Sequence, residues 1–204
     1  NVDNIIDLAN QLFSKGIFVI YMSTSAVFDG SKSFRKAEET LSPITEYGKQ
    51  RADVESHLSC FADSVTILRT TKVVGSTVPL FRERSARLRA NKSIHPFSDM
   101  TLAPIPLKYV VSVLKMIIDR RTNGIFQLSG DRDLSYKEVA FMEAEYLGLK
   151  TELIQPIMAS QYDGYKEPVI KYTTLDMERL KNLFGIIPPK SEWILHQIFS
   201  ILEP

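Results

Sequence analysis

Apolar residues follow two patterns along this chain, one with the spacing of a helix and one of continuous short runs. In residues 3–15 apolar positions recur three and four residues apart, and Gly16 follows as a helix stop, which predicts an amphipathic helix. Residues 17–22 are continuously apolar, as is typical of a parallel strand buried on both faces. The same patterns predict further strands at 64–71, 125–128 and 152–157, and further helices at 45–62, 79–92, 106–119, 135–147, 175–184 and 191–202.

Helices that alternate with short apolar strands indicate an α/β fold with a parallel sheet and right-handed crossovers. Ligands of such sheets bind beyond the carboxyl ends of the strands. The segments that directly follow three of the predicted strands are therefore the first candidates for a site: residues 23–25, 72–75 and 129–131.

The composition is that of an ordinary globular protein, with 44% hydrophobic and 24% charged residues. A net charge of +1 indicates neither a nucleic-acid nor a membrane partner, and the apolar runs are too short to span a bilayer. The single cysteine, Cys60, excludes an internal disulfide framework, and the three histidines have no metal-ligand spacing. The first residues are unlike a signal peptide, so we expect a cytoplasmic protein.

Two runs of residues suggest a specific chemistry. Residues 23–30 read Ser-Thr-Ser-Ala-Val-Phe-Asp-Gly, and residues 43–51 read Pro-Ile-Thr-Glu-Tyr-Gly-Lys-Gln-Arg. In this order and spacing they resemble the extended short-chain dehydrogenase/reductases, and most closely the dTDP-4-dehydrorhamnose reductase branch. The resemblance continues in three later segments, at 67–75, 125–130 and 166–180, and so extends over nearly the whole chain.

This resemblance implies NAD- or NADP-dependent reduction or epimerisation of a nucleotide-linked keto-sugar. It also implies a partial NAD(P)-binding Rossmann fold, made of the C-terminal strands of the parallel sheet, with a small mixed α/β substrate-binding subdomain. The expected division is residues 1–75 for the part of the Rossmann domain with the active-site motifs, 76–106 and 131–175 for substrate-side segments, 107–130 for a returning helix and strand, and 176–204 for C-terminal helices.

The resemblance assigns roles to individual residues. Thr24 is expected to hold the substrate oxygen and Tyr47 to exchange a proton with it, and we expect these two side chains to lie close together. A free tyrosine has a pKa near 10, so the family places a lysine one helical turn beyond the tyrosine; here that position holds Arg51. The residues expected to bind the cofactor are Ser23, Tyr47, Arg51, Thr70 and Thr71, and those expected to bind the substrate are Ser25, Val74, Arg82, Arg87 and Lys166.

Two departures from the family leave a second interpretation open. The chain has no Gly-rich phosphate-binding turn and starts in what looks like the helix before the fourth strand of the fold. We therefore expect a truncated sequence or another chain that supplies the first half, because the apolar strand at 17–22 would otherwise have an unpaired edge; a homodimer is a further expectation. Arg51 also differs from lysine in shape. The alternative to an enzyme is a catalytically inactive homologue that binds a nucleotide-sugar or a protein, as a regulatory subunit or degenerate fragment.

Overall fold

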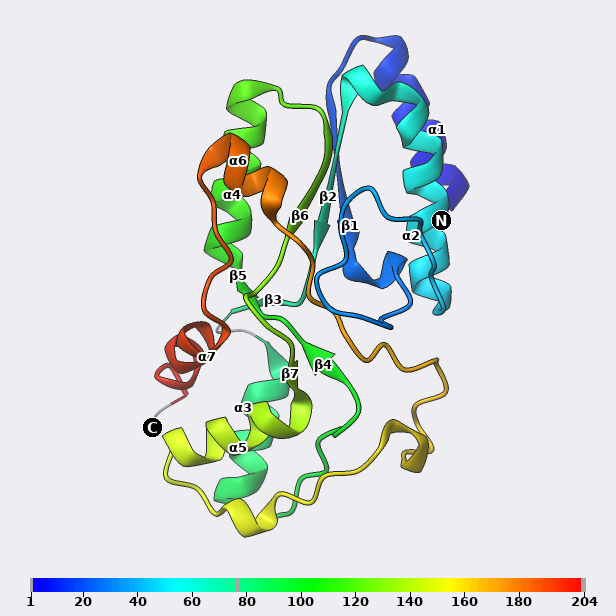
Figure 1. Ribbon diagram of the computed structural model, residues 1–204. Helices are drawn as coiled ribbons and strands as arrows, with labels where there is room; N and C mark the ends of the chain where they lie inside the picture. Colours follow the sequence, from blue (N-terminus) through cyan, green and yellow to red (C-terminus); the bar gives the residue numbers. More distant parts are fainter. Residues whose placement is uncertain (1, 76–77, 203–204) are drawn as a thin grey trace.

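The computed structural model describes residues 2–75 and 78–202, so the predicted segment boundaries at 1, 76 and 204 fall outside the described residues. Its central feature is a three-stranded parallel sheet with the order β1-β2-β6, drawn in the upper part of Figure 1. The strands are β1 (Val19–Thr24), β2 (Val65–Thr70) and β6 (Gly124–Leu128). Each overlaps a predicted strand, and the predicted α/β fold with a parallel sheet is confirmed.

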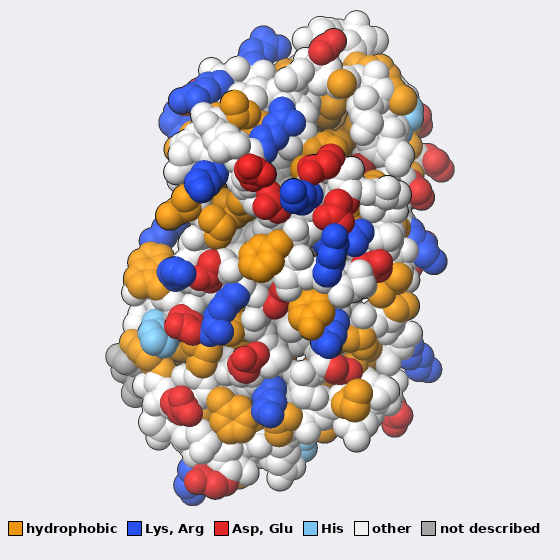
Figure 2. All heavy atoms as spheres, in the orientation of Figure 1, with side chains coloured by type: hydrophobic (Ala, Val, Ile, Leu, Met, Phe, Trp, Pro, Cys, Tyr) orange, Lys and Arg blue, Asp and Glu red, His pale blue; other side chains and the backbone are white. Residues whose placement is uncertain are grey.

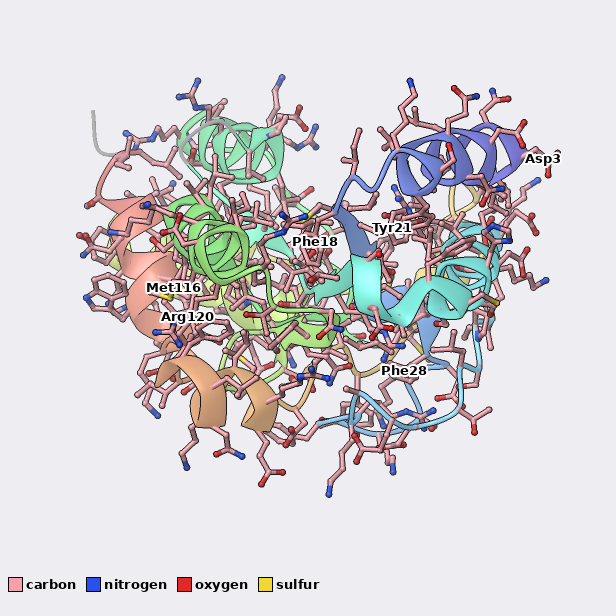
Figure 3. The ribbon with its side chains drawn as sticks, turned by 90° about the horizontal axis from the view of Figure 1, so that it is seen from above. Asp3, Phe18, Tyr21, Phe28, Met116 and Arg120 are labelled. Carbon is pink, nitrogen blue, oxygen red and sulfur yellow. The ribbon has the colours of Figure 1, made fainter. Side chains whose placement is uncertain are left out.

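Helices cover both faces of this sheet. On one face α1 (Val2–Ser14) and α2 (Glu46–Leu58) form an apolar cluster with Tyr21 of β1. On the other face α4 (Leu107–Arg120) forms a cluster against which Phe18 packs. Figure 3 shows Phe18 and Tyr21 on opposite sides of β1, as the alternation of side chains along a strand requires.

A second region lies beyond the carboxyl ends of the three strands, in the lower part of Figure 1. An apolar cluster of Val74, Phe81, Val139 and Phe199, among others, holds three helices together there. These helices are α3 (Pro79–Arg89), α5 (Tyr136–Tyr146) and α7 (Ser191–Phe199).

Short elements connect the two regions. Two pairs of two-residue strands lie between them: β3 (Val73–Val74) is parallel to β5 (Ile105–Pro106), and β4 (Thr101–Leu102) is antiparallel to β7 (Leu134–Ser135). The remaining elements are α6 (Glu178–Phe184), which lies against β6, and the 3-10 turns η1 (Ser25–Val27), η2 (Ser59–Ser64), η3 (Thr151–Leu153) and η4 (Ala159–Gln161).

Signals in the sequence explain where several helices begin and end. The hydroxyl of Ser135 accepts a hydrogen bond from the Glu138 N–H, and the Glu138 carboxylate accepts one from the Ser135 N–H, so the predicted capping box opens α5. Gly185 follows α6 with a φ of 68°, a left-handed conformation that glycine adopts without strain.

Three predicted elements need correction. The strand predicted at 152–157 is wrong: this segment contains η3 and makes only two isolated bridges to residues 94–97. Ile94 and Ser98 donate to the 152–157 segment, but Pro96 between them has no N–H to donate, so the ladder is interrupted there. The helix predicted at 175–184 begins only at Glu178, whose N–H donates to the side chain of Asp176. The helix predicted at 45–62 ends at Leu58 and continues as η2.

Positive and negative side chains are interspersed over the face shown in Figure 2, with no large area of one sign. This distribution agrees with the small net charge of the sequence. None of the helices in the described residues has the length and apolar character needed to cross a membrane.

Candidate active site

The candidate site starts where β1 and β2 end side by side. Thr24 and Thr70, the last residues of these strands, are partners in the parallel register. The Thr70 hydroxyl donates to the carbonyl oxygen of Ser23 at 3.3 Å. Beyond Thr24 the chain enters η1, and the Thr24 hydroxyl accepts a hydrogen bond of 3.2 Å from the Ala26 N–H. A threonine at this position therefore ends the strand and starts the turn.

The first turn of α2 packs directly against this turn. Thr45 caps the helix, and its hydroxyl accepts from the Gly48 N–H at 3.1 Å. A Cβ atom on Gly48 would overlap with the carbonyl oxygen of Ala26. Glycine is thus required for the close approach, which brings the neighbouring Tyr47 to the carboxyl end of β1. This packing gives a physical reason for the Tyr-Gly dipeptide of the sequence.

Thr24 and Tyr47 line the same cavity, which has a volume of about 470 Å³. Four more residues predicted for the site also line it: Ser23, Ser25, Thr70 and Thr71. Residues of the second region, not predicted for the site, close the cavity from the other side: Met100, Thr101, Leu102, Tyr136, Ile170 and Thr173. Nothing in the local sequence pattern marks these residues, because they reach the cavity only through the packing of the second region onto the sheet.

Ser23 differs from the other hydroxyl residues of the cavity. Its side chain is buried, and its Oγ has no hydrogen-bond partner among the described residues. The Thr70 and Thr71 hydroxyls, in contrast, donate to the carbonyl oxygens of Ser23 and Ala103. A buried polar atom without a partner is costly and uncommon in folded proteins, so this hydroxyl is a candidate for contact with a bound ligand.

Arg51 lies behind Tyr47 and does not line the cavity that Thr24 lines. Its Nη1 donates to the Tyr21 hydroxyl at 3.2 Å and to the Met22 carbonyl oxygen at 3.3 Å. Its guanidinium carbon is 5.1 Å from the centroid of the Tyr47 ring. The structure thus places the cation against the face of the tyrosine ring, one helical turn from Tyr47 as the sequence predicts.

The two groups that meet through this hydrogen bond have shifted ionisation. Burial disfavours the charge of Arg51, but the contacts with Tyr21 and Tyr47 outweigh it, and the pKa of Arg51 lies above its ordinary value. Burial raises the pKa of Tyr21, and the hydrogen bond from Arg51 offsets part of that rise.

A larger cavity of about 590 Å³ adjoins the first, because Met100 and Tyr136 line both. Its walls carry Arg84 and the predicted residue Arg87, together with a group of aromatic side chains: Phe97, Tyr136, Tyr162 and Tyr165. Arg87 donates to the Ser93 carbonyl oxygen at 2.9 Å. The two cavities together form one elongated site.

Three residues predicted to bind the substrate do not line either cavity. Val74 is 2% exposed and belongs to the apolar cluster of the second region, while Val73 lines the first cavity. Successive side chains of a strand point to opposite sides, so the prediction for Val74 is corrected to core packing. Arg82 and Lys166 are exposed and outside the residues that line the two cavities. Arg84, which sequence reasoning did not select, reaches the cavity in place of Arg82.

No group of three or more histidine, cysteine, aspartate or glutamate side chains within residues 2–75 and 78–202 is arranged to hold a metal ion. The residues that line the two cavities include Lys72, Glu83 and His95, as well as several that carry hydroxyl, phenol and guanidinium groups. Such groups bind oxygen atoms and phosphates through hydrogen bonds and charge.

The parallel sheet, with hydroxyl and tyrosine side chains at its carboxyl edge, has the architecture of the Rossmann-type extended short-chain dehydrogenase/reductases. A family model described as the RmlD substrate binding domain matches residues 1–203, and the chain belongs to this family.

Individual relatives carry two different descriptions. The chain is 27% identical over 195 residues to methionine adenosyltransferase 2 subunit beta from Pongo abelii, a match that covers 90% of this chain and 57% of that protein. It is 30% identical over 207 residues to dTDP-4-dehydrorhamnose reductase from Sinorhizobium fredii, covering 94% of this chain and 69% of that protein. The chain therefore spans little more than half the length of the adenosyltransferase subunit.

A solved structure shows the same fold. The dTDP-4-dehydrorhamnose reductase from Bacillus anthracis, in complex with NADP, superposes with a TM-score of 0.79 at 19% sequence identity, over 91% of this chain and 66% of that chain. At this identity the likeness concerns the fold.

Proposed function

We propose that this chain carries the active-site and substrate-binding part of an NAD(P)-dependent reductase or epimerase that acts on a nucleotide-linked keto-sugar. The observation that supports this proposal most is the shared cavity of Thr24 and Tyr47 at the carboxyl edge of the sheet. Membership of the RmlD substrate binding domain family and the likeness to dTDP-4-dehydrorhamnose reductases agree with it.

Each residue has a proposed role in this reaction. Tyr47 exchanges a proton with the sugar oxygen, and the Thr24 hydroxyl holds the same oxygen by a hydrogen bond. The nicotinamide cofactor, when bound, supplies or accepts the hydride. The unpartnered Ser23 hydroxyl fits a cofactor or sugar that brings polar atoms to this edge of the sheet. Arg51 contacts the face of the Tyr47 ring and orients it.

The adjoining cavity is proposed to hold the nucleotide. Arg84 and Arg87 supply guanidinium groups, which suit a diphosphate. The aromatic side chains that share this cavity offer flat apolar faces for a base or sugar ring. The keto-sugar would then extend past Tyr136, which lines both cavities, toward Tyr47.

The test starts with binding and continues with turnover. Calorimetric titration of the purified protein with NADPH and with NADH measures cofactor affinity, and reduction of a dTDP- or UDP-linked 4-keto-sugar measures activity. Tyr47→Phe removes the proton donor, so kcat should fall by about 10²–10⁴-fold. Tyr109→Phe removes a phenol that donates to Ile187 at the far side of α4, and it should keep kcat within about twofold. Full activity of Tyr47→Phe would refute the proposed acid/base role.

A second candidate function is that of a non-catalytic regulatory subunit. Two observations favour it: Arg51 occupies the family's lysine position and is hydrogen-bonded to Tyr21, and several relatives are subunits of methionine adenosyltransferase 2. In this case the protein binds the cofactor or nucleotide and turns over no keto-sugar. A gain in turnover of orders of magnitude in Arg51→Lys would indicate a site that has lost catalysis through that one position.

The unpaired edge of β1 suggests where further structural units could bind. Within the described residues β1 is an edge strand, and Phe18 and Ile20 pack against the apolar cluster that contains α4 residues Val113 and Ile117. We propose that further strand–helix units, from the same polypeptide or another, pair with this edge. Hydrogen exchange of the β1 amides should slow when such units are present, and unchanged exchange would contradict the pairing.

The formation of a homodimer remains a prediction, and analytical ultracentrifugation of the purified protein can test it.

A further inference from the structure

Arg51 is held between two tyrosine rings. Its guanidinium carbon is 5.1 Å from the ring centroid of Tyr47 and 5.7 Å from that of Tyr21. The same side chain donates from Nη1 to the Tyr21 hydroxyl and to the Met22 carbonyl oxygen, both in β1. One end of this arrangement is therefore anchored in the sheet, and the other end is Tyr47 on α2.

The two tyrosines differ in how firmly the protein holds them. Tyr21 is buried in the apolar cluster formed by α1, α2 and the sheet, with Val54 and Ile67 as neighbours. Tyr47 is 52% exposed and lies at the first turn of its helix. A half-exposed aromatic ring has room for other side-chain rotamers, and the contact with Arg51 is the one that can favour the orientation seen in the structure.

Tyr47 separates two cavities. It lines the cavity that contains Thr24, and it also lines a smaller one of about 360 Å³ that contains Tyr21 and Arg51. A different rotamer of Tyr47 would change how its ring and hydroxyl are shared between these two cavities. The orientation of this single ring thus decides whether the proposed acid and its hydroxyl partner can act on one oxygen atom.

We propose that Tyr21 is a positioning residue, which acts through Arg51 to hold the ring of Tyr47 in the orientation that serves the cavity of Thr24. This inference rests on the proposed function for its catalytic consequence, but the arrangement of the three side chains can be tested without it.

The chemistry of arginine suits this role better than that of lysine. A guanidinium is planar, so it can stack its face on a ring while it donates hydrogen bonds from its edge. A lysine ammonium can also lie over a ring and donate hydrogen bonds, but it is a compact point charge with no flat face to stack on the ring. Because burial raises the pKa of Tyr21, this phenol stays neutral at physiological pH and remains an acceptor for Arg51. Arg51, at the position of the family's lysine, thus has a hydrogen-bond partner in β1.

The test uses nuclear magnetic resonance of protein labelled with ¹³C at the tyrosine ring ε carbons, with Tyr47→Phe to assign the Tyr47 signal. Tyr21→Phe removes the acceptor and keeps the ring, and Arg51→Met removes the guanidinium at similar length. In both variants the Tyr47 signal should shift or broaden as the ring samples other rotamers. Tyr109→Phe, which removes a phenol elsewhere, should leave that signal unchanged. Thermal melting shows whether each variant is folded.

An unchanged Tyr47 signal in Tyr21→Phe overturns the role of Tyr21, and an unchanged signal in Arg51→Met as well overturns the whole arrangement. If Tyr21→Phe is unfolded, Arg51→Lys provides the second test, since loss of stacking should shift the same signal. In an active protein, kcat of Tyr21→Phe should fall about 10- to 100-fold with little change in KM for the sugar. If the protein has no turnover at all, the proposed function fails, but the Tyr47 signal of the variants still tests whether Tyr21 and Arg51 hold the ring of Tyr47.

Discussion

Each of the two regions of this molecule contains one buried arginine–glutamate pair, and the two pairs are built differently. In the sheet region Arg69 of β2 contacts both carboxylate oxygens of Glu55 in α2, with donor–acceptor distances from 2.7 to 3.1 Å. In the second region Arg84 of α3 contacts one of the two carboxylate oxygens of Glu143 in α5, donating to Oε2 at 2.6 and 2.9 Å. The other oxygen of Glu143 has no partner among the described residues.

The surroundings increase this difference. Arg69 also donates to the Ala37 carbonyl oxygen at 3.0 Å and lies over the ring of Phe28. It thereby stabilises the loop between the Thr24 turn and α2, which contains both residues. Arg84 lies at the wall of the proposed nucleotide cavity. Burial raises the pKa of Glu143 to about 7, although Arg84 acts in the opposite direction. A fully paired buried charge stabilises local structure, whereas an incompletely paired one remains sensitive to pH.

The largest effect is expected from separating the fully paired ions. Glu55→Ala leaves the buried guanidinium of Arg69 without its partner, and the free energy of unfolding should fall by about 3–5 kcal/mol. Urea denaturation followed by circular dichroism measures this loss. The double variant Glu55→Leu with Arg69→Met should recover much of it, because no charge is then left buried. If the double variant is less stable than Glu55→Ala, the stability loss comes mainly from losing the ion pair and not from leaving one charge buried without a partner.

Glu143→Gln should change the pH dependence of stability. The pKa of Glu143 is about 7 in the folded protein against 4.5 for a free glutamate, so the folded state binds more protons between these values. The associated stability is fully present below about pH 4.5 and is lost as the pH rises through 7. Wild-type stability relative to Glu143→Gln should therefore fall over this range, by at most about 1.4 kcal/mol per pH unit. Parallel curves from pH 5 to 8 would contradict the raised pKa.

A smaller effect is expected at the carboxylate that joins the two regions. Asp133 accepts hydrogen bonds from the Ser33 hydroxyl at 2.6 Å, from the Thr101 hydroxyl at 3.1 Å and from the Thr173 N–H at 2.7 Å. Burial opposes its charge, but hydrogen bonds from Ser33, Thr174 and Thr173 outweigh burial and lower the pKa of Asp133. Asp133→Ala should cost about 1–3 kcal/mol of unfolding free energy. The Asp133→Ala variant should keep the pH dependence of stability that the wild type shows around pH 7, because that dependence comes from Glu143. A changed pH dependence in Asp133→Ala would contradict this assignment.

The smallest effect is expected from an exposed pair. Lys115 and Asp119 are 2.9 Å apart on the outer face of α4, with both side chains more than half exposed. Lys115→Ala should change the unfolding free energy by no more than about 0.5 kcal/mol, because solvent screens such pairs. A loss as large as that of Glu55→Ala would mean that burial does not account for the difference among these ion pairs.

Short-range signals made much of the fold predictable. The three strands of the parallel sheet were predicted from their continuous apolar runs, and α5 from its Ser135–Glu138 capping box. The strand predicted at 152–157 failed because an apolar run does not reveal that a proline, Pro96, interrupts the pairing on the partner segment. The four two-residue strands were not predicted, since elements this short have no periodicity to detect.

The family resemblance and the candidates Thr24 and Tyr47 could be read from two short runs of the sequence, residues 23–30 and 43–51. The tertiary structure established which candidates share a cavity, that Gly48 has no room for a side chain against Ala26, that Val74 is in the core, and that Arg51 is bound by Tyr21, 30 residues away. It also decided how Glu55 and Glu143 are paired. Burial and hydrogen-bond partners depend on contacts between segments that are far apart in the sequence. The pattern of one segment therefore does not predict which other segment will pack against it.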